Sequence, residues 1–327
     1  DEPLTLEEFL QPQTHKRLLK LSWDSGSAAY EVADAGEYPE IEEQEPRAWG
    51  YLNGDVLVAA LEDALPYCAT DSTRLVLTGV TLYLGSVLQV AAADGFRLSF
   101  QSLNQSFPLE EKVVIPAAAI KTLKRLWRQE PAQAGMRTNL IEQITQPRRL
   151  RLSVWESRIR VEFAGLSLTS KLIEGNPPDH LHLLNGFKEP IKVKLMASDL
   201  YAAVRRVQSI AREGSGIVRL QWTDSQMTVS ARSAETGEVR AVIPVQSGTI
   251  PGRTALNVVY LLDYLADKEG LITLGKGEDI SAPAIFHYDD RPIVAIMPMQ
   301  VQWDDEPAGE QVKDESAEDE ADTQEGE

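Results

Sequence analysis

The chain has 327 residues, of which 43% are hydrophobic and 25% are charged. This length and composition suit about two or three folded domains and exclude a chain that is disordered throughout. No apolar run approaches the roughly 20 residues of a membrane-spanning helix, and the acidic start lacks the pattern of a signal peptide. The single cysteine, Cys68, excludes an internal disulfide and a zinc site built from several cysteines, which fits a reducing cytoplasm.

The formal net charge of −18 is concentrated at the two ends of the chain. Residues 304–327 hold 12 acidic residues and one lysine, and residues 1–50 hold 12 acidic and four basic residues. Residues 51–303 are therefore close to neutral, so the local placement of Lys and Arg decides whether a polyanion can bind. Residues 304–327 have almost no large apolar side chain, and we expect a disordered acidic tail there.

Between residues 51 and 303 the apolar spacing repeats one unit, a helix followed by three strands. Pro116 suits the first turn of its helix, and Ser198 is the expected N-cap of another. Residues 1–49 predict a short helix at 6–10 and strands at 18–23 and 28–32. The predicted helices of the repeat are 54–68, 116–129, 198–212 and 256–266. The predicted strands are 74–84, 87–93, 96–101, 113–115, 149–154, 158–163, 167–172, 191–195, 217–222, 226–232, 238–245, 271–274, 283–287 and 293–297.

A chain of repeated αβββ units predicts an α+β fold with antiparallel sheets on one side and helices on the other. Two units would make one domain. We therefore expect half of an N-terminal domain at 1–49, a central domain at 50–186, a last domain at 187–303 and the tail at 304–327.

The residues that could carry enzyme chemistry are few. The sequence has no Gly-rich phosphate loop and no nucleophile elbow. His180 and His182 follow Asp179, but a metal site needs three or four convergent ligands, so an ordinary surface loop is favoured. Asp94 and Gly95 predict a turn between two strands rather than a catalytic aspartate.

Two predicted helices carry basic residues on the face opposite their apolar residues. Such a stripe is often a plain solvated face, but stripes that border one surface would bind phosphates without reading base sequence. No aromatic residues alternate with these bases, so the helices do not indicate stacking of unpaired bases. The basic residues are Lys121, Lys124, Arg125, Arg128, Arg205, Arg206 and Arg212.

The folded part ends in an apolar stretch, IVAIMPM, at residues 293–299. Methionine adapts its shape and suits a surface that accepts short apolar peptides. The alternative is that Met297 fills the core of the last strand, and the sequence leaves both interpretations open.

Five short stretches keep the order and spacing of motifs in a known family. The family that they resemble is the beta sliding clamp, the processivity subunit of bacterial DNA polymerase III. The stretches are AAADGFRL (91–98), VVIPAAAIKTLKRL (113–126), LTSKLIEGNPPD (168–179), LNVVYLLDYL (256–265) and IMPM (296–299).

The resemblance implies the DNA-clamp fold, with helices that line a central channel and antiparallel sheets outside. Two protomers would form a homodimeric ring around duplex DNA, independently of its sequence. It further implies a non-catalytic processivity factor for DNA replication, without cofactor or metal, in the bacterial cytoplasm at the nucleoid. The residues expected to face DNA are Arg74, Lys121, Lys124, Arg125, Arg128, Arg205 and Arg206.

The resemblance also implies a hydrophobic pocket between the central and last domains. Short linear motifs of the replicative polymerase, the clamp loader and repair proteins would bind there. The residues carried over to this pocket are Leu77, Gly95, Phe96, Arg97, Leu98, Val218, Asn257, Tyr260, Met297, Pro298 and Met299.

The chain departs from the family pattern in ways that keep alternatives open. Ala93 stands at a usual threonine position, and Gln300 and Val301 replace a usual Arg-Leu pair. The first domain is represented by only its second half, so an adaptor that binds peptides without closing a ring is an alternative. A metal-dependent hydrolase or nuclease is disfavoured by the lack of a ligand cluster. The acidic tail is expected to shield the pocket or to repel DNA that approaches from that face, and the alternative is a segment that only increases solubility.

Overall fold

The computed structural model describes residues 4–10, 16–33, 36, 44–129, 148–248 and 250–303. The chain divides into two compact units, Asp1–Glu45 and Pro46–Glu327. The predicted acidic tail at 304–327 lies outside the described residues. Among the described helices, none is long and apolar enough to cross a membrane.

The first unit is a three-stranded antiparallel sheet in the order β1-β2-β3. The predicted helix at 6–10 is wrong, because these residues pair with β2 along their whole length, from Thr5 opposite Ser22 to Leu10 opposite Arg17. Hydrogen bonding to a distant strand decides this segment, and the two strands predicted after it are confirmed. The strands are β1 Thr5–Leu10, β2 Arg17–Trp23 and β3 Gly26–Glu31.

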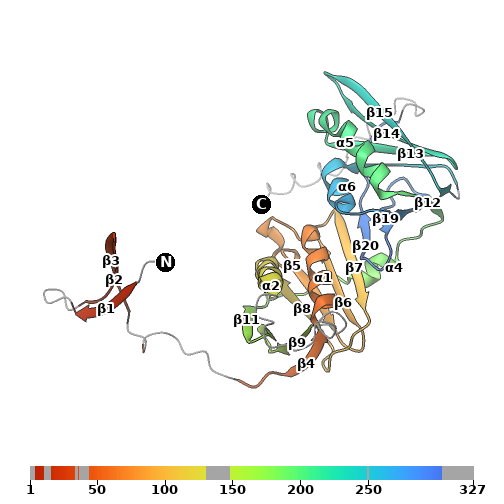
Figure 1. Ribbon diagram of the computed structural model, residues 1–327. Coiled ribbons are helices and arrows are strands. Elements are labelled where there is room, and N and C mark those ends of the chain that lie inside the picture. Colours follow the sequence, from red (N-terminus) through yellow and green to blue (C-terminus); the bar gives the residue numbers. More distant parts are fainter. Residues whose placement is uncertain are drawn as a thin grey trace, which may run out of the picture. The chain divides into compact units, whose positions relative to one another are not determined.

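The second unit contains the predicted helix-and-strand repeats, and its α+β class is confirmed (Figure 1). Its first part runs from β4 to α4. The elements are β4 Ala48–Asn53, α1 Gly54–Ala64, the 3₁₀ helices η2 Leu65–Tyr67 and η3 Ser72–Leu77, β5 Gly79–Leu84, β6 Leu88–Ala93, β7 Arg97–Leu103, β8 Glu111–Pro116, α2 Ala117–Gln129, β9 Arg149–Val154, β10 Arg158–Phe163, β11 Leu166–Lys171 and α4 His180–Asn185.

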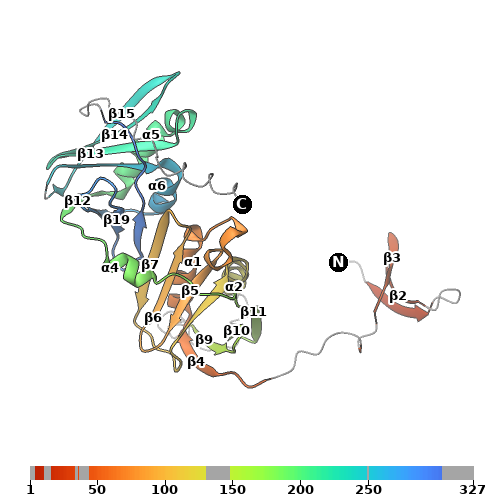
Figure 2. The ribbon, with the colours of Figure 1, turned by 180° about the vertical axis from the view of Figure 1, so that it is seen from behind.

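The second part of this unit repeats the same plan around another pair of helices, α5 and α6, which pack together as α1 and α2 do (Figure 2). Its elements are β12 Ile191–Met196, α5 Ala197–Glu213, β13 Ile217–Trp222, β14 Gln226–Ser233, β15 Gly237–Pro244, β16 Ser247–Gly248, β17 Gly252–Asn257, α6 Val258–Leu265, β18 Leu271–Lys276, β19 Ala284–His287 and β20 Ile293–Ile296.

Three antiparallel sheets organise the unit, in the orders β11-β10-β9-β4, β15-β14-β13-β17 and β16-β12-β18-β19-β20-β7-β6-β5-β8. The nine-stranded sheet crosses the predicted domain boundary. There β20 pairs with β7, with Ile293 opposite Phe100 and Ile296 opposite Arg97. Backbone hydrogen bonds therefore join the central and last domains into one continuous sheet.

The helices are held on the sheets by their apolar faces. Ile120, Leu123 and Trp127 of α2 are buried in the core that α1 shares. The first residue of α1, Gly54, lies against Trp127, and a Cβ at this position would lie 2.1 Å from the Trp127 ring. The close approach of the two helices thus depends on the absence of a side chain there.

Several local predictions are wrong, for identifiable reasons. Residues 74–77 are not strand but belong to η3, because Asp71 caps this turn by accepting a hydrogen bond from the Thr73 N–H at 2.6 Å. Ser198 does not cap α5, which begins one residue earlier and has Met196 at its N-cap. The strands β4 and β17 and the helix α4 were not predicted, and the expected boundary at residue 49 falls inside β4.

Candidate functional site

The predicted basic stripe of α2 lies on its solvent side, but half of it is paired. Lys121 and Arg125 are exposed. Lys124 forms an ion pair with Glu62 of α1, and Arg128 donates to the same carboxylate at 2.7 Å. The charge that α2 offers to a phosphate backbone is therefore carried mainly by Lys121 and Arg125.

The stripe on α5 is exposed as predicted. Arg205 and Arg206 are open to solvent, and the Arg205 guanidinium also donates to the Gln208 side chain at 2.7 Å. The neighbouring helices α1 and α6 contain no lysine or arginine, so each helix pair has one basic member. Arg74 is exposed and belongs to η3, not to either basic helix.

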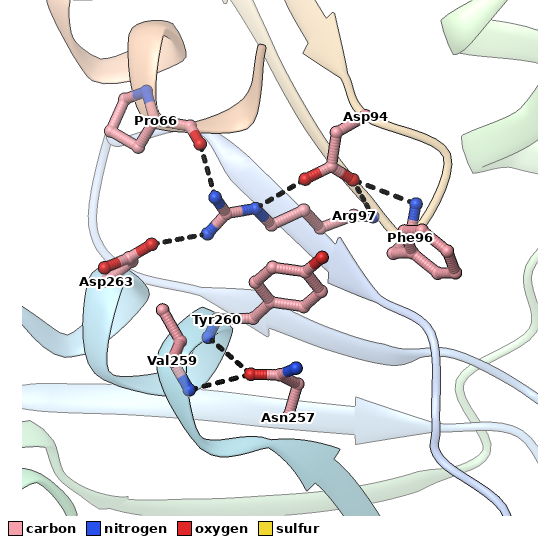
Figure 3. A network of polar contacts seen from close by, with 8 residues as sticks. All are labelled: Pro66, Asp94, Phe96, Arg97, Asn257, Val259, Tyr260 and Asp263. Atoms are coloured by element: carbon pink, nitrogen blue, oxygen red, sulfur yellow. Dashed lines mark hydrogen bonds and ion pairs between the residues drawn. The ribbon is translucent and has the colours of Figure 1, made fainter. Parts of the chain in front are cut away.

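Arg97 is the centre of a polar network at the junction of the central and last domains (Figure 3). Its guanidinium donates to Asp94 at 3.0 Å, to Asp263 of α6 at 2.8 Å and to the Pro66 carbonyl at 2.6 Å. It also stacks over the Tyr260 ring, 4.3 Å from its centre. Only 9% of the Arg97 side chain is exposed.

The charge of Arg97 is stabilised by these partners. Burial would lower the pKa of Arg97, but the hydrogen bonds that its guanidinium donates to Asp263 and Asp94 outweigh this effect and raise the pKa above its usual value. A second ion pair crosses the junction, and here the base belongs to the last domain and the acid to the central domain: Arg291 lies 2.6 Å from Asp63. Asp63, Asp263 and Arg291 line a cleft of about 530 Å³ between the domains.

The structure brings together the part of the predicted pocket that comes from the β6–β7 turn and the start of α6. Phe96 lies beside Tyr260, with ring centres 6.5 Å apart, and 59% of Phe96 is exposed. Asn257 caps α6 by accepting hydrogen bonds from the Val259 and Tyr260 N–H groups (Figure 3). Gly95 has a φ of +95°, which favours glycine in this tight turn.

The other predicted pocket residues separate into two groups. Val218 is fully buried in β13, and Leu77 and Leu98 are nearly so, which places all three beneath the surface. Met297 and Met299 are 41% and 37% exposed, so Met297 does not fill the core of the last strand. Met297 borders a groove that is formed by residues 186–190, 277–279 and 281–283.

The chemistry-bearing residues considered in the sequence have structural roles. Asp94 and Gly95 form the predicted turn between β6 and β7, and Asp94 also holds Arg97. Burial raises the pKa of the Cys68 thiol to about 12. Among the described residues, no group of three His, Cys, Asp or Glu side chains is placed to hold a metal ion.

The prediction that His180 lies on a surface loop is wrong. His180 begins helix α4 and is 1% exposed, with its Nδ1 atom 2.8 Å from the Tyr83 hydroxyl. Burial lowers the pKa of His180 to about 4, against the opposing effect of Asp179. His180 therefore packs α4 against the central sheet in its neutral form.

The acidic partners Glu62 and Asp263 were not predicted from the sequence. Asp263 is 166 residues from Arg97 along the chain, and Glu62 is 66 residues from Arg128. These acidic residues are too far along the chain from their arginine partners for any helix or strand periodicity to relate them. The pairs are therefore recognised only in the folded structure.

Two family models match the second unit. Residues 52–179 match the central domain of the DNA polymerase III beta subunit, and residues 188–270 match its C-terminal domain. Together these matches cover more than half of the chain.

Curated relatives and solved structures agree with these models. The beta sliding clamp of Caulobacter vibrioides is 26% identical over 286 residues, which cover 83% of this chain and 70% of the relative. That of Chlamydia muridarum is 23% identical and covers 86% and 73%, respectively. The crystal structure of the beta subunit from Pseudomonas aeruginosa has a TM-score of 0.75 at 22% identity, covering 91% of this chain and 77% of that one.

The fold of the solved clamps, the curated relatives and the two consecutive family models all agree with the motifs in the sequence. The chain therefore belongs to the family of the DNA polymerase III beta subunit, the bacterial sliding clamp, and contains its central and C-terminal domains.

Proposed function

We propose that this DNA sliding clamp encircles duplex DNA as one protomer of a homo-oligomeric ring and tethers the replicative polymerase. It acts as a non-catalytic processivity factor. The ring holds DNA by topology, so its contacts with the backbone need only be diffuse and independent of sequence. The basic helices α2 and α5 are the part of the chain that contacts the DNA backbone in this proposal.

The observation that carries this proposal is the repetition of one exposed basic helix in each of two equivalent helix pairs. Lys121 and Arg125 of α2 and Arg205 and Arg206 of α5 project into solvent from helices whose other faces are buried. Long cationic side chains on a rigid support bind phosphates without fixing register. Lys124 and Arg128 contribute less, because Glu62 already neutralises part of their charge.

The test compares exposed with paired bases on the same helix. The double variant Lys121→Glu/Arg125→Glu should shorten retention on nicked circular duplex DNA more than Lys124→Glu/Arg128→Glu does. The double variant Lys112→Glu/Lys194→Glu, on strands β8 and β12, makes the same charge change away from the helices and should retain DNA as the wild type does. Equal retention by all three variants would overturn the assignment of the DNA-facing side.

The oligomeric state is measured in the same preparations by light scattering. A closed homo-oligomer is expected, whereas a protein that remains monomeric and binds partner peptides would support an adaptor that does not close a ring. Retention that is lost when the circle is linearised identifies topological linkage, since diffuse binding alone would persist on the linear molecule.

For the partner pocket, we propose the surface around Phe96, Tyr260 and Met299 as the place where short linear motifs of polymerase, clamp loader and repair proteins bind. The exposure of Phe96 and Met299 supports this assignment, because burial of their apolar side chains by a peptide is favourable by about 25 cal/mol per Å². The solved Pseudomonas aeruginosa clamp in complex with griselimycin is 22% identical to this chain and has a TM-score of 0.73. The binding of griselimycin to that clamp is consistent with a ligand-binding pocket in a protein of this fold.

A further inference from the structure

The outer face of the small sheet β11-β10-β9-β4 has an unusual composition. The register places twelve side chains of the four strands on this face. Five of them are basic, two are aromatic and one, Glu162, is acidic. The basic and aromatic residues are Trp49, Tyr51, Arg149, Arg151, Arg158, Arg160 and Lys171. We call this surface the outer sheet face.

The outer sheet face is distinct from the helices assigned to duplex DNA. Leu150, Leu152 and Ile159 alternate with its arginines and are buried on the opposite side of the sheet. There they pack in the core that also contains the apolar residues of α1 and α2. The sheet therefore separates the two surfaces, and a variant on one leaves the other intact.

The arginines and aromatic rings of the outer sheet face are already arranged around one another. Arg151 lies over Trp49, with its guanidinium carbon 4.6 Å from the ring centre, and Arg149 lies over Tyr51 at 5.0 Å. The two rings meet edge to face at 6.1 Å. Trp49 and Tyr51 nevertheless remain 49% and 57% exposed, so each presents free ring surface to solvent.

The same arrangement extends to the far side of the sheet. Arg158 and Arg160 lie over the buried ring of Trp155, at 4.8 and 5.2 Å. Lys171 is exposed opposite Arg158. Across the three strands β9, β10 and β11 this positions cations over a width of about 9 Å. Glu162 reduces the charge at only one point, where it lies 3.5 Å from Arg151.

We propose that the outer sheet face binds single-stranded nucleic acid, with unpaired bases stacked on Trp49 and Tyr51 and phosphates bound by the surrounding arginines and Lys171. An antiparallel sheet with exposed rings can stack two or three unpaired bases, and cations beside the rings follow the backbone. Duplex DNA fits less well, because its base faces are already stacked. An acidic peptide would match the charge but would leave the two exposed rings without a role.

The charge of the rest of the chain strengthens this choice of ligand. The protein carries a net charge of −18, which repels polyanions at long range. On this acidic chain the outer sheet face, with five basic residues and one acidic residue, is a locally positive surface, as the basic face of α2 is. The site extends the proposed function, since single-stranded template lies next to the duplex that a replication clamp holds, but it does not depend on ring closure.

The test measures fluorescence anisotropy of a labelled oligothymidylate of about 12 nucleotides with the full chain at about 50 mM salt. Trp49→Ala should weaken binding roughly 5-fold or more, as expected for the loss of one stacked base. Trp49→Phe should restore most of the affinity, because stacking needs a ring. Arg149→Ala should reduce the slope of the logarithm of the binding constant against the logarithm of the salt concentration, by the amount expected for the loss of about one phosphate contact.

Tyr51→Ala tests the second ring of the outer sheet face, and Tyr30→Ala is its matched control. Tyr30 lies on β3 of the first unit and is 56% exposed, nearly the same as Tyr51, so only the Tyr51 variant should lose affinity. Thermal unfolding of each variant checks that the fold is retained.

Three results would overturn the proposal. These are no binding of the oligothymidylate, equal affinity of the wild type and Trp49→Ala, or equally tight binding of a duplex of the same length. A peptide with the sequence of residues 304–327 can be tested as a competitor. If it displaces the oligonucleotide and binds Trp49→Ala more weakly than the wild type, the face belongs instead to the acidic tail. None of these outcomes changes the retention of circular DNA, so the proposed function is judged separately.

Discussion

Replacing Arg97 by methionine tests whether the two domains are joined by a buried ion pair or by the sheet alone. The substitution removes three hydrogen bonds, to Asp94, Asp263 and the Pro66 carbonyl, and the stacking on Tyr260. Since only 9% of the Arg97 side chain is exposed, its partners lose a desolvated cation. We expect the free energy of unfolding to fall by about 3–5 kcal/mol.

Arg291→Met is the matched control at the same junction. Arg291 also forms an ion pair across the domains, with Asp63 at 2.6 Å, but 54% of its side chain is exposed. Solvent screens such a pair, so its loss should cost about 1 kcal/mol or less. Urea unfolding followed by tryptophan fluorescence measures both variants. If Arg97→Met is no more destabilising than Arg291→Met, burial is not what makes the Arg97 network strong.

Two further predictions concern pH and peptide binding. The pKa of His180 is about 4 in the folded protein and 6.5 when unperturbed, so the unfolded chain binds a proton in this window that the folded protein does not. Stability present above pH 6.5 should therefore fall towards pH 4, by up to about 3 kcal/mol more than in His180→Gln, and parallel urea-unfolding profiles for the two proteins would contradict this. Phe96→Ala should weaken binding of a Gln-Leu-x-Leu-Phe-type peptide by roughly 5- to 30-fold, whereas Val242→Ala, on exposed β15, should not. Calorimetry that finds equal affinities would remove Phe96 from the pocket.

The strands with regular alternation were predicted to the residue. In β9 and β10 every second residue is apolar and buried, and the predicted bounds 149–154 and 158–163 agree with the structure. In β13 the predicted bounds 217–222 also agree. In these segments local pattern and tertiary burial favour the same conformation, so the sequence alone was sufficient.

The errors arise where a distant partner or a single side chain decides the conformation. The segment 6–10 becomes a strand through its pairing with β2, and Asp71 turns an apolar β-like run into η3. β4 was overlooked because Gly50 interrupts its pattern at an expected domain boundary. This omission also hid the aromatic half of the outer sheet face, since Trp49 and Tyr51 both belong to β4.

The basic residues of α2 and α5 were predicted from their spacing, but their effective charge was not. Helical periodicity identifies which side chains share a face. It does not reveal that Glu62 of another helix lies beside Lys124 and Arg128. Sequence patterns therefore located the candidate surface, whereas the three-dimensional contacts decide which of its cations remain available.

The pairing of β20 with β7 has a mechanical consequence. Any hinge motion between the two domains would have to break backbone hydrogen bonds along the shared strands and pull Arg97 away from Asp263. This joint is consequently stiff. If a closed ring opens to admit DNA, the deformation must be taken up at other joints, and the central and last domains would move as a single rigid arm.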